Sequence, residues 1–273
     1  MMQPIDEATL AGWRGAVGRR VTQRERLCAG DLSRFALAVG VAARDAAVPL
    51  PHWAFFLPMP QDSEIGEDGH PRRGDFLPAI TLPRRMFAAA DMTFDAPLSL
   101  DAEAALESEV VDVRHKQGRS GDLVFVEVAR TLTQAGVVRV RERQTYVYRD
   151  QGAPVAMPVA AASLPDGERW QPDEVNLFRF SAATFNGHRI HYDHPYATAV
   201  EGYPALVVHG PLTAAKLARL AARDGELAGF SFRAEAPLFL GQPVVLERCG
   251  EGAVRAVRCD GAIAMTAQAR YRQ

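Results

Sequence analysis

Two short segments of the chain recur in the same order and at nearly the same spacing. Residues 34–38 (RFALA) resemble residues 179–183 (RFSAA), and residues 95–100 (DAPLSL) resemble residues 235–240 (EAPLFL). The two offsets are 145 and 140 residues, a difference that one loop can absorb. Either match alone would be weak, but together they indicate an internal repeat. A chain of 273 residues is long enough to form two such units, each with its own core.

The predicted elements also follow a similar order in the two halves. The first half has a short helix at 5–16, a helix that begins at Asp31, a proline- and glycine-rich loop at 50–85, and strands from 89 to 149. The second half has a helix-like stretch followed by strands at 228–238, 243–249, 253–258 and 262–272. The sequence therefore predicts two copies of a helix-plus-antiparallel-sheet unit. The predicted boundaries are a first domain at 1–149, a linker at 150–173 and a second domain at 174–273.

The charge balance and the cysteines exclude several protein classes. Lysine and arginine number 31 against 33 acids, for a net charge of -2, and the basic residues occur as singles and pairs. We therefore expect no nucleic-acid partner and no membrane association. The first residues carry acids and no long apolar run follows, so no secretion signal is expected. Cys28, Cys249 and Cys259 form no CxxC pair and are predicted to be buried, reduced thiols, which favours a cytoplasmic protein.

The richest cluster of chemical groups lies at residues 184–194 (TFNGHRIHYDH). An imidazole such as that of His191 can take up and return a proton near neutral pH. The amide of Asn186 cannot titrate, but it can donate and accept hydrogen bonds and so hold a water or a thioester oxygen. These two side chains are candidate catalytic groups.

A second candidate element follows at residues 207–216 (VVHGPLTAAK). Pro211 suits the first turn of a helix, where its missing N–H is not needed. The free backbone N–H groups of a helix start, with Gly210 allowing close approach, can stabilise a developing oxyanion. Gly210 is therefore the third candidate catalytic residue.

These two segments resemble the MaoC-like hot-dog hydratases and dehydratases, whose motif combines a histidine with a later His-Gly at a helix start. The stretch FNGHRIHYD at 185–193 is similar to the branch that contains the hydroxyacyl-thioester dehydratases of type 2 and the mesaconyl-C4-CoA and itaconyl-CoA hydratases. The resemblance covers most of the chain. It implies an α+β double hot-dog fold, with two tandem antiparallel sheets each wrapped around a central helix, and a hydro-lyase that acts on acyl-CoA.

The resemblance also implies roles for individual residues. His191 takes the place of the catalytic histidine, and Gly210 that of the glycine whose N–H polarises the thioester carbonyl. Asn186 stands where the broader family has an aspartate, so a scheme with two acid–base side chains is in doubt and His191 is the main proton carrier. His188 and His209, which adjoin these residues, are candidate substrate-binding groups.

The repeat predicts a single site in the chain. The 145-residue offset puts Val41 opposite Asn186 and Ala46 opposite His191, so the first copy lacks both groups. The first domain is therefore expected to be a degenerate hot-dog that completes the sheet and walls the substrate tunnel.

Three arginines could bind a second carboxylate on the acyl chain, because a guanidinium offers paired donors. Arg189 lies in the motif, and Arg84 and Arg85 close the long loop of the first domain. This reading favours a C5 dicarboxylic thioester such as itaconyl-CoA or mesaconyl-C4-CoA, which would give citramalyl-CoA. Binding of coenzyme phosphates and structural ion pairs are the alternatives for the same arginines.

Other functions stay open at this stage. A 3-hydroxyacyl-thioester dehydratase shares the transition state of hydration, and hot-dog folds also host acyl-CoA thioesterases. A third alternative is a non-catalytic acyl-binding subunit. The histidine spacing fits no standard zinc motif, so no metal is expected, and no cofactor other than the coenzyme A of the substrate. The acyl-CoA is the expected partner, and a homodimer is also considered. His52, His70 and His115 are isolated and are predicted to be surface or loop residues.

Overall fold

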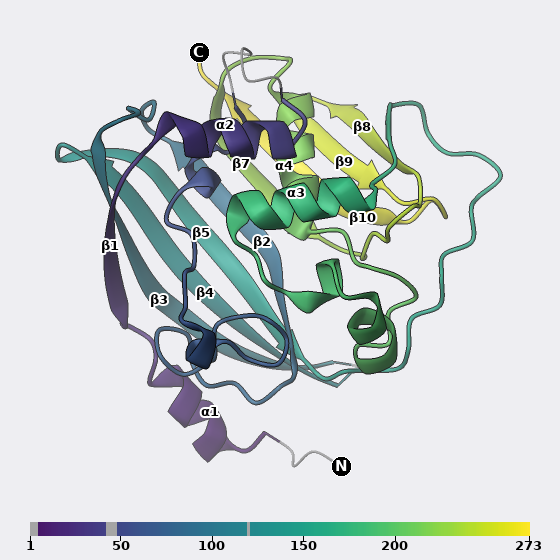
Figure 1. Cartoon of the computed structure of the whole chain (residues 1–273), viewed down its shortest axis with the longest axis horizontal. Coiled ribbons are helices and arrows are strands. Elements are labelled where there is room, and N and C mark those ends of the chain that lie inside the picture. The colour runs from purple at the N-terminus through teal and green to yellow at the C-terminus, as the bar shows by residue number, and fades with distance from the viewer. Residues whose placement is uncertain (1–4, 42–47, 119–120) are drawn as a thin grey trace.

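The computed structural model describes residues 5–41, 48–118 and 121–273. Within these residues a single antiparallel sheet has ten strands, in the order β1-β3-β4-β5-β2-β7-β10-β9-β8-β6 (Figure 1). The strands are β1 (Arg20–Arg26), β2 (Arg84–Phe94), β3 (Glu103–Gly118), β4 (Gly121–Gln134), β5 (Val137–Arg149), β6 (Glu168–Trp170), β7 (Leu227–Ala234), β8 (Val244–Gly250), β9 (Ala253–Val257) and β10 (Ile263–Tyr271). The helices are α1 (Glu7–Arg14), α2 (Ala29–Ala38), α3 (Glu174–Thr184) and α4 (Gly210–Ala221), with short helical turns η1 (Pro51–Ala54), η2 (Asp62–Glu64), η3 (Arg189–His191) and η4 (Tyr196–Val200).

The strand order is a mirror image about the centre of the sheet. Each half contributes five strands, and β2 of the first half pairs with β7 of the second. Alternate pairs between these strands are apolar, with Ala90 opposite Phe232 and Met92 opposite Phe230, and all four residues belong to one core cluster that the two halves share. This arrangement confirms the α+β double hot-dog fold. The two predicted tandem sheets are joined by the pairing of β2 with β7 into one continuous sheet.

The ends of α2 and α3 confirm the repeat at the level of individual hydrogen bonds. The Val41 N–H donates to the Ala36 carbonyl and the Asn186 N–H donates to the Ser181 carbonyl, both at 2.9 Å. The residue before each donor has a positive φ, +79° at Gly40 and +49° at Phe185. Both helices therefore end in the same left-handed turn. Val41 thus occupies the position of Asn186, whereas Ala46, the predicted counterpart of His191, lies outside the described residues.

The two halves differ in what covers the sheet. In the second half the largely buried helix α4 packs on β2 and on β7 to β10, and its alanines allow close contact. In the first half the described residues form no such helix, and α1 and the end of the long loop cover β3 to β5 instead. Leu10 and Trp13 of α1 pack with Ile80 and Leu82 of the loop in one apolar cluster. The prediction of a central helix in each half was therefore wrong for the first half.

Several local predictions also need correction. Helix α2 begins at Ala29 after Cys28, two residues before the predicted start at Asp31. Strand β1 was not predicted because it is almost entirely exposed and lacks an apolar alternation. Strand β6 lies inside the predicted linker. Cys28 and Cys249 are exposed, and only Cys259 is buried. No helix among the described residues is both long enough and apolar enough to span a membrane.

Candidate active site

One cavity of about 1540 Å³ lies where the two halves meet. Its walls come from the end of α3, the segment that follows it, the start of α4, the first residues of β2, and the long loop of the first half. The predicted catalytic residues Asn186, His191 and Gly210 all line this cavity. Residues that are distant in the sequence therefore contribute to one site.

His191 is held in a defined orientation at the end of the short helix η3. Its side chain is buried, with 7% of its surface exposed, and Nδ1 lies 2.7 Å from the carbonyl oxygen of Val207. A carbonyl oxygen can only accept, so Nδ1 carries the proton and Nε2 keeps its lone pair. Burial lowers the pKa of His191 to about 4, a shift that the Val207 carbonyl partly opposes. The imidazole is thus a neutral base at neutral pH.

The ring of His209 packs against the ring of His191. The two rings stack with centroids 3.6 Å apart, and His209 Nε2 lies 2.9 Å from Ser181 Oγ on α3. His209 is fully buried and does not line the cavity. It therefore fixes the position of His191 and has no direct access to a substrate.

Asn186 follows the left-handed turn at the end of α3, which directs its side chain into the cavity. Its Oδ1 accepts a hydrogen bond from the His188 backbone N–H at 2.9 Å. This contact fixes the amide and leaves its NH₂ group, for which the described residues provide no acceptor, available to a ligand.

Gly210 is the first residue of α4, after His209 at the N-cap. Pro211 has no N–H, and the Thr213 N–H is bound to the His209 carbonyl at 3.1 Å. The Gly210 N–H has no acceptor within the described part of the chain. It is therefore available to a ligand oxygen at the positive end of the helix.

The three predicted arginines have different surroundings. Arg84 forms a buried ion pair with Glu201, Nε to Oε2 at 2.9 Å, and also donates to the Glu201 backbone carbonyl. Arg189 forms an ion pair with Asp193 at 2.7 Å and does not line the cavity. Arg85 lines the cavity and is partly buried, and no ion pair of its side chain is found in the described residues. The alternative of a structural ion pair thus describes Arg84 and Arg189, and Arg85 remains as the candidate for an anionic group.

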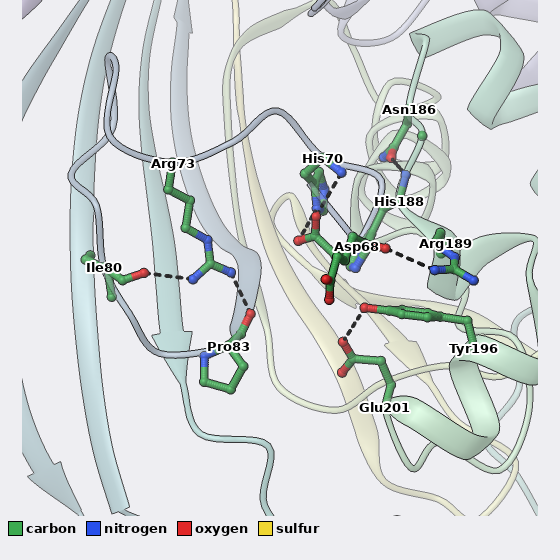
Figure 2. A network of polar contacts seen from close by, with 12 residues as sticks. Asp68, His70, Arg73, Ile80, Pro83, Asn186, His188, Arg189, Tyr196 and Glu201 are labelled. Atoms are coloured by element: carbon green, nitrogen blue, oxygen red, sulfur yellow. Dashed lines mark hydrogen bonds and ion pairs between the residues drawn. The ribbon is translucent and has the colours of Figure 1, made fainter. Parts of the chain in front are cut away.

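The sequence did not predict the contribution of Asp68 and His70, which belong to the long loop of the first half (Figure 2). His70 Nδ1 lies 3.2 Å from Asp68 Oδ2, and the His70 ring lies 4.0 Å from that of His188. The prediction that His70 is a surface or loop residue missed its place in the cavity wall. The signal in the sequence that pointed toward His70 was the long ordered loop itself, since such loops are often functional.

The other two histidines that were predicted to be surface or loop residues lie in different surroundings. His52 is buried beside Glu142, whereas His115 lies on β3 and pairs with Asp122.

A tight contact between two glycines holds this loop against the catalytic segment. A Cβ atom on Gly69 would lie 1.9 Å from the Gly187 carbonyl oxygen, and Gly69 has a φ of +84°. The backbone N–H of Arg189 donates to the Asp68 carbonyl at 2.9 Å. The loop of the first half is therefore a fixed part of the site.

Asp68, His70 and His188 form the one group of potential metal ligands among the described residues, with ligand atoms within 4.8 Å of one another. Both oxygens of the Asp68 carboxylate already accept from His70, one from the ring and one from the backbone N–H. The charge of Arg85 also acts on Asp68 and lowers its pKa further, which places a guanidinium close to the group. These features fit an acid–base cluster better than a cation site.

A model of the hydroxyacyl-thioester dehydratase type 2 family matches residues 50–240. The chain belongs to this family. The match spans the long loop of the first half, the segment with Asn186 and His191, and the start of α4. The predicted catalytic residues and the loop that carries His70 are thus part of the family match.

The chain is also similar to individual known proteins, in sequence and in structure. The chain is similar to the mesaconyl-C(4)-CoA hydratase of Chloroflexus aurantiacus, with 42% identity over 84% of this chain and 86% of the relative. Among solved structures, HtdX of Mycobacterium tuberculosis has a TM-score of 0.68 at 18% identity, covering 92% of this chain and 100% of HtdX. Another M. tuberculosis protein, with a double hot-dog fold, has a TM-score of 0.56 at 12% identity and covers 93% of this chain and 95% of its own. The two structural similarities concern the fold alone.

Proposed function

We propose that this family member is an enoyl-CoA hydratase that adds water to a C5 dicarboxylic acyl-CoA. The observation that carries the proposal is the state of His191. Its Nδ1–H is bound to Val207, which leaves an unprotonated Nε2, and it lines one cavity with Asn186 and the Gly210 N–H. These are a base, an amide and an oxyanion donor, the groups that hydration of a conjugated thioester needs.

The mechanism follows from these three groups. The Gly210 N–H donates to the thioester carbonyl oxygen and stabilises the enolate-like transition state. The Asn186 amide and His191 Nε2 hold a water molecule, and His191 takes a proton from it as the oxygen bonds to the β-carbon. The α-carbon then receives a proton. The scheme requires no cofactor beyond the coenzyme A of the substrate.

Arg85 supports a substrate with a second carboxylate. A partly buried guanidinium without an ion pair in the described chain favours an anionic ligand, which it can bind with two hydrogen bonds. The relative at 42% identity is a mesaconyl-C(4)-CoA hydratase, and the acyl group of that thioester carries a free carboxylate. We therefore propose mesaconyl-C4-CoA or itaconyl-CoA as substrate and citramalyl-CoA as product.

A panel of thioesters tests this function. The purified protein is incubated with mesaconyl-C4-CoA, itaconyl-CoA and crotonyl-CoA, and loss of the conjugated-thioester absorbance is followed. We expect a higher kcat/KM for a dicarboxylic thioester than for crotonyl-CoA. A preference for crotonyl-CoA would overturn the proposed substrate class, and release of free thiol without hydration would indicate a thioesterase.

Dehydration of a 3-hydroxyacyl thioester is the second candidate, and the family match supports it. Hydration and dehydration share one transition state, so the same groups serve both directions. Incubation with 3-hydroxybutyryl-CoA and citramalyl-CoA, with the appearance of the conjugated thioester as readout, compares the two classes of product.

A further inference from the structure

Two imidazoles of the motif at 184–194 line the cavity, those of His188 and His191, whereas the amide of Asn186 does not titrate. A third imidazole in the cavity wall, that of His70, comes from the first half of the chain. Its partner Asp68 accepts from the ring Nδ1 at 3.2 Å and from the backbone N–H at 3.0 Å. An imidazole and a carboxylate in this relation form an oriented acid–base pair.

The surrounding loop fixes this pair. The Gly66 N–H donates to the His70 carbonyl at 2.8 Å, and the Gly69 N–H donates to the Gly66 carbonyl at 3.0 Å. Arg189 anchors the loop from the other side, through its backbone N–H to the Asp68 carbonyl and its guanidinium to the Glu67 carbonyl at 3.1 Å. This is a use for Arg189 that differs from substrate binding.

The charges that face His70 act in opposite directions. Asp68 favours the protonated ring, whereas burial and the positive charges of Arg85 and Arg73 disfavour it, so that the pKa of His70 lies below its usual value. The neighbouring His188 is kept neutral by burial, which lowers its pKa far below the usual range. The pKa of Asp68 is about 2, because the hydrogen bonds and charge of His70 outweigh the effect of burial. A charged carboxylate is thus always present to stabilise a proton on His70.

We propose that His70, oriented by Asp68, is the second acid–base group of the reaction and exchanges the proton of the substrate α-carbon. This inference rests on the proposed hydratase function. The ring of His188 neighbours both acid–base histidines, with its centroid 4.0 Å from that of the His70 ring and 5.3 Å from that of the His191 ring. The proposal therefore includes His188 as the group through which a proton returns from His191 to His70.

The proton balance closes without another reactant. In hydration, His191 Nε2 takes a proton from water, the water oxygen bonds to the β-carbon, and the electron pair of the double bond moves toward the α-carbon. The protonated His70 gives its Nε2 proton to the α-carbon and becomes neutral. The proton on His191 then returns to His70 through His188, which restores the starting state. Dehydration follows the same steps in reverse.

The test compares His70→Gln and Asp68→Asn with His115→Gln. His115 is a matched control, because it also pairs with an aspartate, His115 Nε2 to Asp122 Oδ1 at 2.7 Å, but it lies on β3 and does not line the cavity. We expect His70→Gln to lose a factor of about 10²–10⁴ in kcat, the usual contribution of a general acid or base. Asp68→Asn should lose less, and His115→Gln should keep the wild-type rate. Thermal melts check the folding of each variant.

A purely structural role would not change the pH profile. The wild-type rate should fall at low pH, as His191 is protonated, and should also fall as the pH rises through the lowered pKa of His70, below the usual histidine value of about 6.5. In His70→Gln the fall toward higher pH should disappear, and added imidazole should restore activity to His70→Ala. In His188→Gln the steady-state rate should fall by a larger factor than the rate of the first turnover, because the return of the proton limits only the later turnovers.

Four outcomes would overturn the inference. The first is a His70→Gln rate within threefold of wild type, and the second is a slowed His70→Gln variant with an unchanged pH profile and no rescue of His70→Ala by imidazole. The third is an unchanged steady-state rate in His188→Gln. The fourth is a stoichiometric metal in chelator-washed wild-type protein that is lost in His70→Gln. A wild-type protein that turns over none of the thioesters would instead refute the proposed function, and the inference with it.

Discussion

The imidazole Nδ1 of His191 donates to the backbone carbonyl of Val207 across 2.7 Å, so that the other ring nitrogen is the only one free for chemistry. His191→Asn tests this division, because an asparagine amide nitrogen can take the place of Nδ1 and keep the bond to Val207. We expect His191→Asn and His191→Ala to lose turnover alike, by a factor of about 10²–10⁴. The rate is measured by absorbance of the conjugated thioester, with a melting curve as control for folding. A His191→Asn variant that retains a tenth of the wild-type rate would contradict the role of Nε2.

Arg85 and Arg189 should respond differently to the same substitution. Arg85→Gln removes a guanidinium in the cavity wall, and loss of a charge-assisted contact should lower kcat/KM for a dicarboxylic thioester by a factor of about 10–100. The rate with crotonyl-CoA should change little. Arg189→Gln should not change the preference between the two substrates, because that guanidinium is bound to Asp193 and lies outside the cavity wall. Equal losses on both substrates in Arg85→Gln would instead favour binding of a coenzyme phosphate.

The repeat allowed much of the fold to be predicted from the sequence. The same left-handed turn follows α2 and α3, and its two sequences, near Gly40 and near Phe185, can be aligned without coordinates. The joining of the halves through β2 and β7 could not be predicted, because strand pairing between distant segments leaves no local pattern. The described residues of the first half form no helix equivalent to α4, and the sequence did not predict this, because the apolar residues that the long loop buries also leave no local pattern.

The site could be predicted only where its residues are close in sequence. Asn186 and His191 lie five residues apart, and Gly210 follows in a recognisable helix start. His70 comes from the other half, and contacts between distant segments bring it to the cavity: the close approach of Gly69 to Gly187 and the hydrogen bond from the Arg189 N–H to the Asp68 carbonyl. Arg84 and Arg85 look equivalent in the sequence. They differ because Glu201, distant in the chain, forms an ion pair with Arg84, whereas the described residues include no ion pair between Glu201 and Arg85.

Gly69→Ala should disrupt the site without a change to any catalytic side chain. The new methyl group would lie 1.9 Å from the Gly187 carbonyl oxygen, so the loop that carries His70 must move away. Gly136→Ala is the matched control, because Gly136 also has a positive φ, +79°, but a Cβ there meets nothing within 4 Å. Both variants carry backbone strain of about 1–2 kcal/mol, because an L-residue is disfavoured in the left-handed region. Turnover of both variants is measured under identical conditions, and we expect a strong loss only in Gly69→Ala. Similar losses in both variants would show that the contact between Gly69 and Gly187 does not position the site.

The buried histidines should make the free energy of unfolding fall in mild acid. Burial lowers the pKa of His191 to about 4 and lowers that of His209 well below its usual value, whereas the unfolded chain has a histidine pKa of about 6.5. Between these values the unfolded state binds more protons, so stability decreases as the pH falls from 6.5 toward 4 and is unaffected by these groups above 6.5. His209→Gln removes one such group and can keep a hydrogen bond to Ser181. Urea unfolding at pH 7.5, 6 and 5 should therefore give a smaller pH dependence for the variant than for the wild type, whatever its stability at pH 7.5. Equal slopes would mean that His209 is protonated to the same extent in the folded and unfolded states.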